Sequence, residues 1–154
     1  MKYSEIIETS YRGDHAAPDP DTGSPLYDVT LFKTYPVDFY DHTGFRYYAD
    51  QGRPDDRLSY DKIKSCKDQP NKLITIFRAI PKNVYKDIMK MKDINYLDHL
   101  IRNGDWVTGS KQYAKDHGEA EFGRNNYKLV FNRVPAKYIF TNGDSIHEWG
   151  YYKE

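Results

Sequence analysis

The sequence predicts a single α+β domain over residues 1–154. Runs of β-branched and aromatic residues alternate with short segments of helical periodicity, but not in the regular strand-helix-strand order of an α/β protein. The length of 154 residues fits one compact domain. Only 38% of the residues are hydrophobic while 16% are aromatic, so we expect an aromatic-rich core beneath a polar surface.

Turn-forming residues dominate the first sixty positions. Three prolines within residues 18–25 rule out a long helix there and favour a shaped loop. Short aromatic segments follow at residues 35–40 and 45–48. Residues 61–67 are compatible with either a short helix or a loop.

The clearest strand is predicted over residues 72–80, which are rich in β-branched and aromatic side chains. It ends at Pro81, because proline cannot continue the hydrogen-bonded ladder of a central strand. Arg78 occupies a position in this strand where an apolar side chain would be expected. An amphipathic helix follows, since apolar side chains recur at helical spacing at Val84, Ile88 and Met91.

The next predicted elements surround Ser110. A turn at residues 103–105 leads into a short strand at residues 106–108. Ser110 is placed to cap a helix over residues 111–117, and Gly118 is a natural stop for that helix.

Two further strands are predicted over residues 127–134 and 137–141, on either side of Pro135. Residues 142–145 then form a turn ahead of the segment 146–151. The predicted strands therefore outnumber the helices, and all the helices are short.

The balance of charge gives no field that would attract a polyanion to the whole protein. The chain has 23 basic and 23 acidic residues, whereas proteins that bind nucleic acid or anionic membranes usually carry a strongly basic surface. Residues 1–70 contain 13 acids and 9 bases, and residues 71–154 contain 10 acids and 14 bases. We therefore expect an anionic ligand to meet the C-terminal half.

The single cysteine, Cys66, excludes an intrachain disulfide and a multi-cysteine zinc site. Its polar neighbours indicate a surface cysteine rather than a reactive thiol. No apolar run approaches the ~18 residues of a membrane span, and the first residues lack the apolar core of a signal peptide. We therefore expect a soluble cytoplasmic protein without a membrane partner.

Several kinds of site are excluded by their missing motifs. The sequence has no Gly-x-Gly and no Gly-Lys-Ser/Thr, so the dinucleotide fingerprint and the phosphate loop of NTPases are absent. The five histidines show no spacing typical of metal ligands. We expect no metal and no tightly held cofactor.

Three segments remain that carry chemistry, and together they resemble a known family. They are the strand with Arg78 in "ITIFRAIP", the segment "GDWVTGSKQYAKDHG" and the segment "TNGDSIHEWGY". Together with the segment "YRGDHAAPDPDTGSPLYD" nearer the start, these segments resemble the sequences of mono-ADP-ribosyltransferases, in particular a branch found in phage and prophage proteins. The resemblance extends from about Tyr11 to Tyr151.

The resemblance implies both a fold and a function. The fold is an ADP-ribosyltransferase-like mixed split β-sheet core with short flanking helices. The function is that of a glycosyltransferase that consumes NAD and transfers ADP-ribose to a macromolecule. A phage or mobile element would encode it, and the acceptor in the host cytoplasm would be a host or defence component, including one of a CRISPR system.

The resemblance also implies roles for the strand arginine and the late glutamate. Cleavage of the nicotinamide-ribose bond builds positive charge on the ribose, as in glycoside hydrolysis. Glu148 would bind the ribose hydroxyl and stabilise this cation. Arg78 would bind the NAD phosphates or the adjoining ribose, because a guanidinium presents a rigid fork that matches phosphate oxygens.

The remaining candidates would complete the NAD pocket. Thr108 and Ser110 would position Glu148 and line the nicotinamide pocket with their hydroxyls. Tyr113 or Trp149 would stack on the nicotinamide ring. From the N-terminal match, Arg12 and His15 would meet the diphosphate or cover the pocket, which the sequence leaves open.

Each candidate also has a structural interpretation. Arg78 can pair with a structural carboxylate, Ser110 can act only as a helix cap, and Glu148 can be a surface acid. Members of the superfamily that modify arginine often carry a second acid two positions before the glutamate, but here that residue is Ile146. An arginine acceptor is thereby less favoured than another side chain, a nucleic-acid base or water.

Two other functions remain open. The first is a catalytically inactive ADP-ribosyltransferase-like protein that inhibits a partner by binding, for which the many tyrosines would suit an interface. The second is a metal-independent ribonuclease, in which His117 or His147 acts with Glu148 and Arg78.

Overall fold

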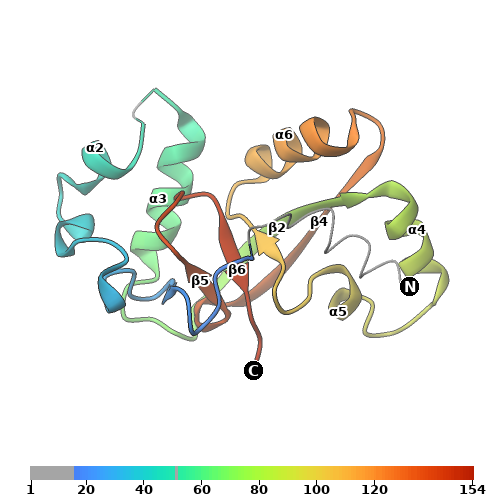
Figure 1. Ribbon diagram of the computed structural model, residues 1–154, viewed down its shortest axis with the longest axis horizontal. Helices are drawn as coiled ribbons and strands as arrows, with labels where there is room; N and C mark the ends of the chain where they lie inside the picture. The colour runs from blue at the N-terminus through green and yellow to red at the C-terminus, as the bar shows by residue number, and fades with distance from the viewer. Residues whose placement is uncertain (1–15, 51) are drawn as a thin grey trace.

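Two antiparallel sheets form the framework of the computed structural model, which describes residues 16–50 and 52–154 (Figure 1). The first sheet contains, in spatial order, β1 (Ser24–Pro25), β5 (Ile139–Thr141), β6 (Trp149–Tyr151) and β3 (Trp106–Val107). The second pairs β2 (Leu73–Pro81) with β4 (Tyr127–Pro135) along their whole length. The expected α+β class is confirmed.

Every ladder between the described strands is antiparallel. The expectation of a mixed sheet is therefore wrong for this part of the chain. The physical reason is that the segments between paired strands bring the chain back in the opposite direction, whereas parallel neighbours need a crossover that restores it.

Within the described residues, one isolated β-bridge joins the two sheets, between Phe77 of β2 and Thr108, which directly follows β3. The backbone N–H of Phe77 donates to the Thr108 carbonyl at 2.8 Å, and the N–H of Thr108 donates to the Phe77 carbonyl at 3.0 Å. Because of this bridge, Arg78 of the second sheet lies beside the edge of the first.

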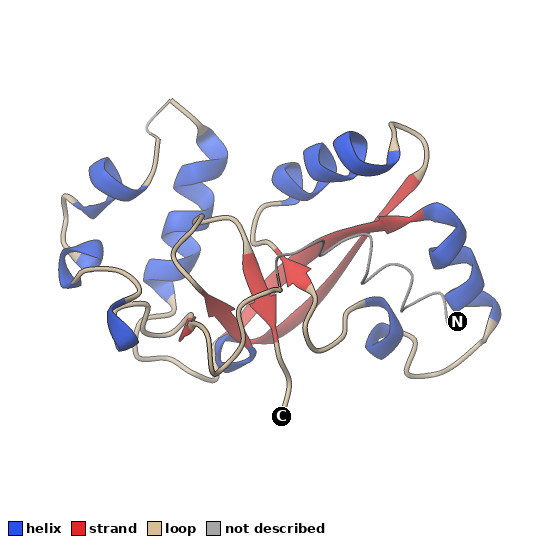
Figure 2. Ribbon diagram, viewed as in Figure 1, coloured by secondary structure: helices blue, strands red, loops and turns tan. Residues whose placement is uncertain are grey.

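Helices surround this framework (Figure 2). The α-helices are α2 (Gly44–Tyr48), α3 (Pro54–Ser65), α4 (Lys82–Lys90), α5 (Leu97–Leu100) and α6 (Lys111–Phe122). The 3-10 helices are η1 (Leu31–Lys33), η2 (Val37–Tyr40) and η3 (Ala136–Tyr138). Figure 1 shows α2 and α3 at one end of the molecule and α4 and α5 at the other, with α6 along the β2-β4 ribbon. None of the helices in the described ranges has both the length and the apolar character of a membrane span.

The helix after Ser110 is longer than the sequence predicts. It continues through Gly118 and ends at Gly123, whose φ of 94° favours glycine. Gly118 is needed for a different reason: a Cβ there would lie 2.6 Å from the ring of Tyr127 and 2.8 Å from the Cβ of Ala79. The glycine therefore permits close packing of α6 on the β2-β4 ribbon.

Other boundaries were also only partly predictable. Residues 61–67 contain the end of α3, which begins with Pro54 at its first turn. The strand expected over residues 137–141 is preceded by η3 and starts only at Ile139.

The core is rich in aromatic side chains, as the composition predicts. Tyr35, Phe39 and Tyr60 are buried. The centroid of the Phe39 ring lies 4.7 Å from that of Tyr35 and 4.9 Å from that of Tyr60. Cys66 belongs to the same core and is 0% exposed, so its interpretation as a surface cysteine is wrong. Burial raises the pKa of its thiol and thereby suppresses the reactive thiolate.

Candidate functional site

A cavity of about 320 Å³ lies where the two sheets meet the start of α6. Its polar and aromatic lining residues come from three separate stretches of the sequence: Phe77, Arg78, Trp106, Thr108, Tyr113, His117, Asp144 and Glu148. Arg78, Thr108 and Glu148, which are predicted to act together, therefore line one cavity.

Strand pairing explains how these three groups meet. In the first sheet Trp106 pairs with Gly150 and Val107 pairs with Trp149. Thr108 directly follows β3 and Glu148 directly precedes β6, so this pairing brings both residues to the same end of the ladder. The bridge between Thr108 and Phe77 then places Arg78 next to them. The site thus depends on contacts between segments that are 30 or more positions apart.

Arg78 is buried and forms an ion pair with Asp105, whose side chain is only 1% exposed. The inward positions of β2 are otherwise apolar, for example Ile76 and Ile80, so the arginine replaces a core side chain as expected. Oδ2 of Asp105 also accepts a 2.7 Å hydrogen bond from the backbone N–H of Arg102. The carboxylate partner that a structural interpretation of Arg78 requires is therefore Asp105, which the sequence showed only as part of a turn.

Ser110 does not line the cavity. Its hydroxyl accepts a 3.0 Å hydrogen bond from the backbone N–H of Tyr113, and the residue is 0% exposed. It is the N-cap of α6, and this use of its oxygen turns it away from the pocket. The expectation that Ser110 lines a nicotinamide pocket is wrong, while Thr108 does line the cavity and accepts a 3.2 Å bond from the Ser110 N–H.

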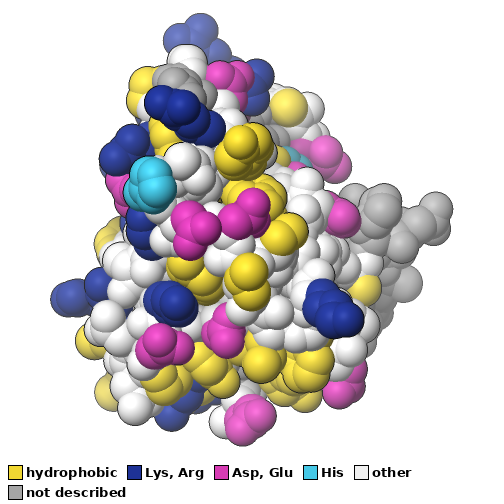
Figure 3. Space-filling view, turned by 90° about the vertical axis from the view of Figure 1, so that its left-hand side faces the viewer, with side chains coloured by type: hydrophobic (Ala, Val, Ile, Leu, Met, Phe, Trp, Pro, Cys, Tyr) yellow, Lys and Arg dark blue, Asp and Glu magenta, His cyan; other side chains and the backbone are white. Residues whose placement is uncertain are grey.

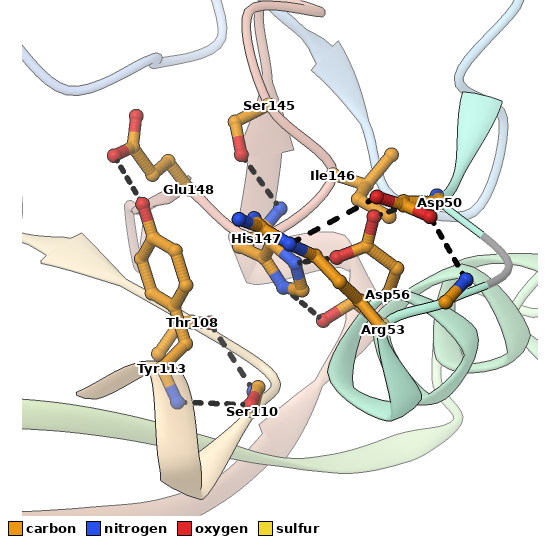
Figure 4. Close-up of polar contacts among 12 residues, drawn as sticks. Asp50, Arg53, Asp56, Thr108, Ser110, Tyr113, Ser145, Ile146, His147 and Glu148 are labelled. Carbon is orange, nitrogen blue, oxygen red and sulfur yellow. Dashed lines mark hydrogen bonds and ion pairs between the residues drawn. The ribbon is translucent and has the colours of Figure 1, made fainter. Parts of the chain in front are cut away.

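Tyr113 connects the cavity to a buried polar group behind it (Figure 4). Its hydroxyl donates a 2.6 Å hydrogen bond to Oε1 of Glu148. Its ring stacks on the imidazole of His147, with centroids 4.6 Å apart and planes inclined by 16°. Tyr113 is thus on the cavity wall, as predicted, with one ring face covered by His147.

Both nitrogens of His147 are engaged by α3. Nε2 donates to Oδ1 of Asp56 at 2.7 Å, and a 2.8 Å hydrogen bond joins Nδ1 to the Ser59 hydroxyl. Burial opposes ionisation of Asp56, but bonds from the backbone N–H of Asp50 and from His147 outweigh it and lower the pKa of Asp56. The result is a buried, ordered polar cluster.

A second cavity, of about 500 Å³, lies on the other side of this cluster. It is lined by the start of α3, including Arg53 and Asp55, and by Asp116 of α6. Tyr113 and His117 line both cavities and form the wall between them.

The structure places Trp149 away from the cavity. It is fully buried, and its indole N–H donates to the Ile146 carbonyl at 3.0 Å. Glu148, just before β6, lines the cavity, whereas Trp149, the first residue of β6, is packed in the core. Its proposed stacking on nicotinamide is therefore wrong. The candidates Arg12 and His15 lie outside the described residues.

Ile146 stands two positions before Glu148, where superfamily members that modify arginine often carry a second acid, and its side chain is buried. Among the side chains of residues 16–50 and 52–154, no group of three or more His, Cys, Asp or Glu is arranged to hold a metal ion.

The sequence interpretation missed Asp105, Asp56 and Ser59. Asp56 and Ser59 are three positions apart on one helix, a spacing that places them on one face. Their partner His147 is 91 and 88 positions further on, so nothing local indicates the pairing. A buried arginine in a strand does call for a carboxylate, and that signal could have led to Asp105.

Comparison with known proteins gives no relative: no family model matches the chain, and no curated protein or solved structure is significantly similar to it.

Proposed function

We propose that the protein is an NAD-dependent mono-ADP-ribosyltransferase and that NAD binds in the 320 Å³ cavity. The observation that supports this best is the convergence of Arg78, Thr108 and Glu148 on that cavity from three separate segments. These are the residues that carry the resemblance of the sequence to the family.

Glu148 has the position and the chemistry for bond cleavage. When the bond between nicotinamide and ribose C1′ breaks, its electron pair leaves with nicotinamide and positive charge develops on the ribose. A half-buried carboxylate stabilises such a cation more than an exposed one would, since less water screens it. A nucleophile of the acceptor then bonds to C1′ and loses its proton.

Thr108 and Arg78 would hold the dinucleotide. Thr108 lines the same cavity as Glu148, and its hydroxyl group can orient the nicotinamide ribose. Arg78 carries positive charge on the cavity wall, and Asp105 fixes the plane of its guanidinium. Phosphate oxygens are the natural ligand of an oriented guanidinium.

The proposal includes the fold and the setting that the resemblance implies. Two sheets joined by one bridge support a split ADP-ribosyltransferase-like core, here with antiparallel ladders only. The source would be a phage or a mobile element, and the acceptor a macromolecule of host metabolism or defence, with a host protein favoured and CRISPR components included. NAD is consumed as a substrate, and the reaction takes place in the cytoplasm.

The experiment is a search for transferred ADP-ribose. Isotope-labelled NAD is incubated with bacterial lysate and wild-type protein, Glu148→Gln, or Glu121→Gln, an exposed acid of α6 that serves as a matched control. Mass spectrometry of proteins and nucleic acids is expected to show adducts with wild type and Glu121→Gln only. Absence of both label transfer and nicotinamide release with wild type would overturn the proposal.

One observation favours the alternative of an inactive binding protein. Large apolar side chains are exposed on the N-terminal helical segments, with Phe32 at 74%, Val37 at 80% and Tyr47 at 73%. Figure 3 shows hydrophobic side chains interspersed with charges of both signs on the side of the molecule that carries these segments. A binding inhibitor would keep its full potency in Glu148→Gln, whereas an enzyme would lose its effect.

The geometry argues against only one of the two histidines named in the ribonuclease hypothesis, because His117 lines the cavity with Arg78 and Glu148. Both ring nitrogens of His147 are bonded within the protein, to Asp56 and Ser59. General acid-base catalysis needs a ring nitrogen within reach of the substrate.

A further inference from the structure

We propose that His147 is a positioning residue: held by Asp56 and Ser59 of α3, it fixes the Tyr113 ring, whose hydroxyl in turn holds the Glu148 carboxylate. This inference rests on the proposed function, because it assigns a cause to the orientation of the glutamate. It also assigns a role to α3, a helix that contains none of the motifs quoted for the resemblance.

The first step is the immobilisation of the imidazole. Ser59 is 0% exposed and His147 is 7% exposed, so water competes little for the hydrogen bond between them. The two bonds grip opposite sides of the ring, at Nδ1 and Nε2. The backbone N–H of His147 also donates to the Ser145 hydroxyl at 3.1 Å, which fixes the chain just before Glu148.

The second step is the orientation of Tyr113. Its backbone is fixed by the Ser110 cap, but a cap does not determine the side-chain rotamer. The nearly parallel stack on His147, inclined by 16°, restrains the ring plane. The Tyr113 side chain is therefore restrained twice, by the hydrogen bond at its backbone and by the stacking of its ring on His147.

The third step carries this order to the carboxylate. Glu148 has three rotatable side-chain bonds, and its orientation is not determined by the strand alone. The 2.6 Å bond from Tyr113 selects one orientation, and Figure 4 shows Tyr113 between Glu148 and His147. A displacement of a catalytic group by about 1 Å can cost about 100-fold in rate.

The test is a double-variant cycle measured by nicotinamide release from NAD. Ser59→Ala removes one bond to His147, and Tyr113→Phe removes the hydroxyl but keeps the ring. We expect each to lower kcat by about tenfold or more, with KM for NAD changed by less than about twofold because the Tyr113 ring stays on the cavity wall in both variants. The combined variant is expected to match Tyr113→Phe alone, since both changes act through one hydroxyl.

Ser65→Ala is the matched control. Ser65 lies on the same helix, but it is exposed and its hydroxyl donates to the backbone carbonyl of Lys62 instead of bonding to His147. We expect its kcat to equal that of wild type. His147→Phe, which retains an aromatic face for stacking, is expected to recover part of the kcat lost in His147→Ala. Multiplicative losses in the double variant, or equal losses in His147→Phe and His147→Ala, would overturn the inference.

A measurement without NAD separates this inference from the proposed function. The NMR resonances of the Tyr113 ring sense the ring current of the stacked imidazole. We expect Ser59→Ala to shift them and Ser65→Ala to leave them in place. Unchanged Tyr113 resonances in Ser59→Ala would contradict the positioning role even in an active enzyme. Shifted resonances in a protein that releases no nicotinamide would contradict only the proposed function.

Discussion

Arg78 of β2 and Asp105, which precedes β3, form an ion pair that is almost completely buried. The pair joins the second sheet to the edge of the first, next to the bridge between Phe77 and Thr108. A residue proposed to bind the phosphates of NAD is therefore also part of the packing between sheets. Changes at Arg78 must be designed to separate these two roles.

Asp105→Ala is expected to lower the free energy of unfolding by about 3–5 kcal/mol, because removal of one partner leaves an uncompensated buried charge. The double variant Arg78→Met with Asp105→Leu is expected to recover most of this stability, since apolar residues of similar volume can replace a buried pair. Urea denaturation measures both effects.

The same double variant tests the phosphate role. Although folded, it is expected to bind NAD at least about tenfold more weakly by calorimetry, since a charged hydrogen bond is worth about 1.5–3 kcal/mol. Wild-type affinity in this variant would show that Arg78 serves packing alone.

Ser110→Ala is expected to destabilise the protein by about 0.5–2 kcal/mol through loss of the α6 cap. Ser110→Asp, which supplies an equivalent cap oxygen but no hydroxyl, is expected to restore both the melting temperature and nicotinamide release. If Ser110→Asp folds like wild type but is inactive, the serine hydroxyl has a chemical role that its position in the structure does not explain.

Gly118→Ala is expected to destabilise the protein, although alanine is the better helix former by about 1 kcal/mol. The added methyl would approach Tyr127 and Ala79 to within 2.6 Å and 2.8 Å. Overpacking of this kind costs about 1–3 kcal/mol, and thermal unfolding measures the sum. An increase in melting temperature would mean that α6 does not pack this closely on the ribbon.

Stability is expected to fall in acid partly through Asp56. Because its pKa is lowered in the folded protein, its contribution is complete above its ordinary value of 3.8 and is lost as the pH falls through the lower, folded value. Asp56→Asn is therefore expected to show a shallower loss of unfolding free energy below about pH 5. Asp93, whose pKa is lowered by its bond to His99, contributes with the same sign and leaves a residual slope. Identical slopes in the two proteins would contradict this assignment.

Local signals in the sequence account for much of the framework. The composition and closing proline of residues 72–80 predict β2, and the Ser110 cap predicts the start of α6. Both depend on interactions within a few residues. The length of α6 was not predictable in this way. Gly118 is required for close packing against Tyr127 and does not mark the end of the helix.

The candidate site was predictable only in part. The order of Arg78, Thr108 and Glu148 along the chain indicated residues that the structure brings to one cavity. Their partners were not predictable, because they come from distant segments of the chain. Asp105 pairs with Arg78, and Asp56 and Ser59 bond to His147. Trp149 was misassigned because it begins β6 and packs in the core, which its position next to Glu148 in the sequence does not indicate.

The central claim is that this cavity binds NAD and that Glu148 promotes cleavage of its glycosidic bond. The most direct measurement is the rate of nicotinamide release from NAD by purified wild-type protein and by Glu148→Gln, with NAD affinity measured in parallel by calorimetry. We expect a rate at least about 100-fold lower in Glu148→Gln, with NAD affinity retained. Equal rates in the two proteins, or no detectable NAD binding to wild type, would contradict it.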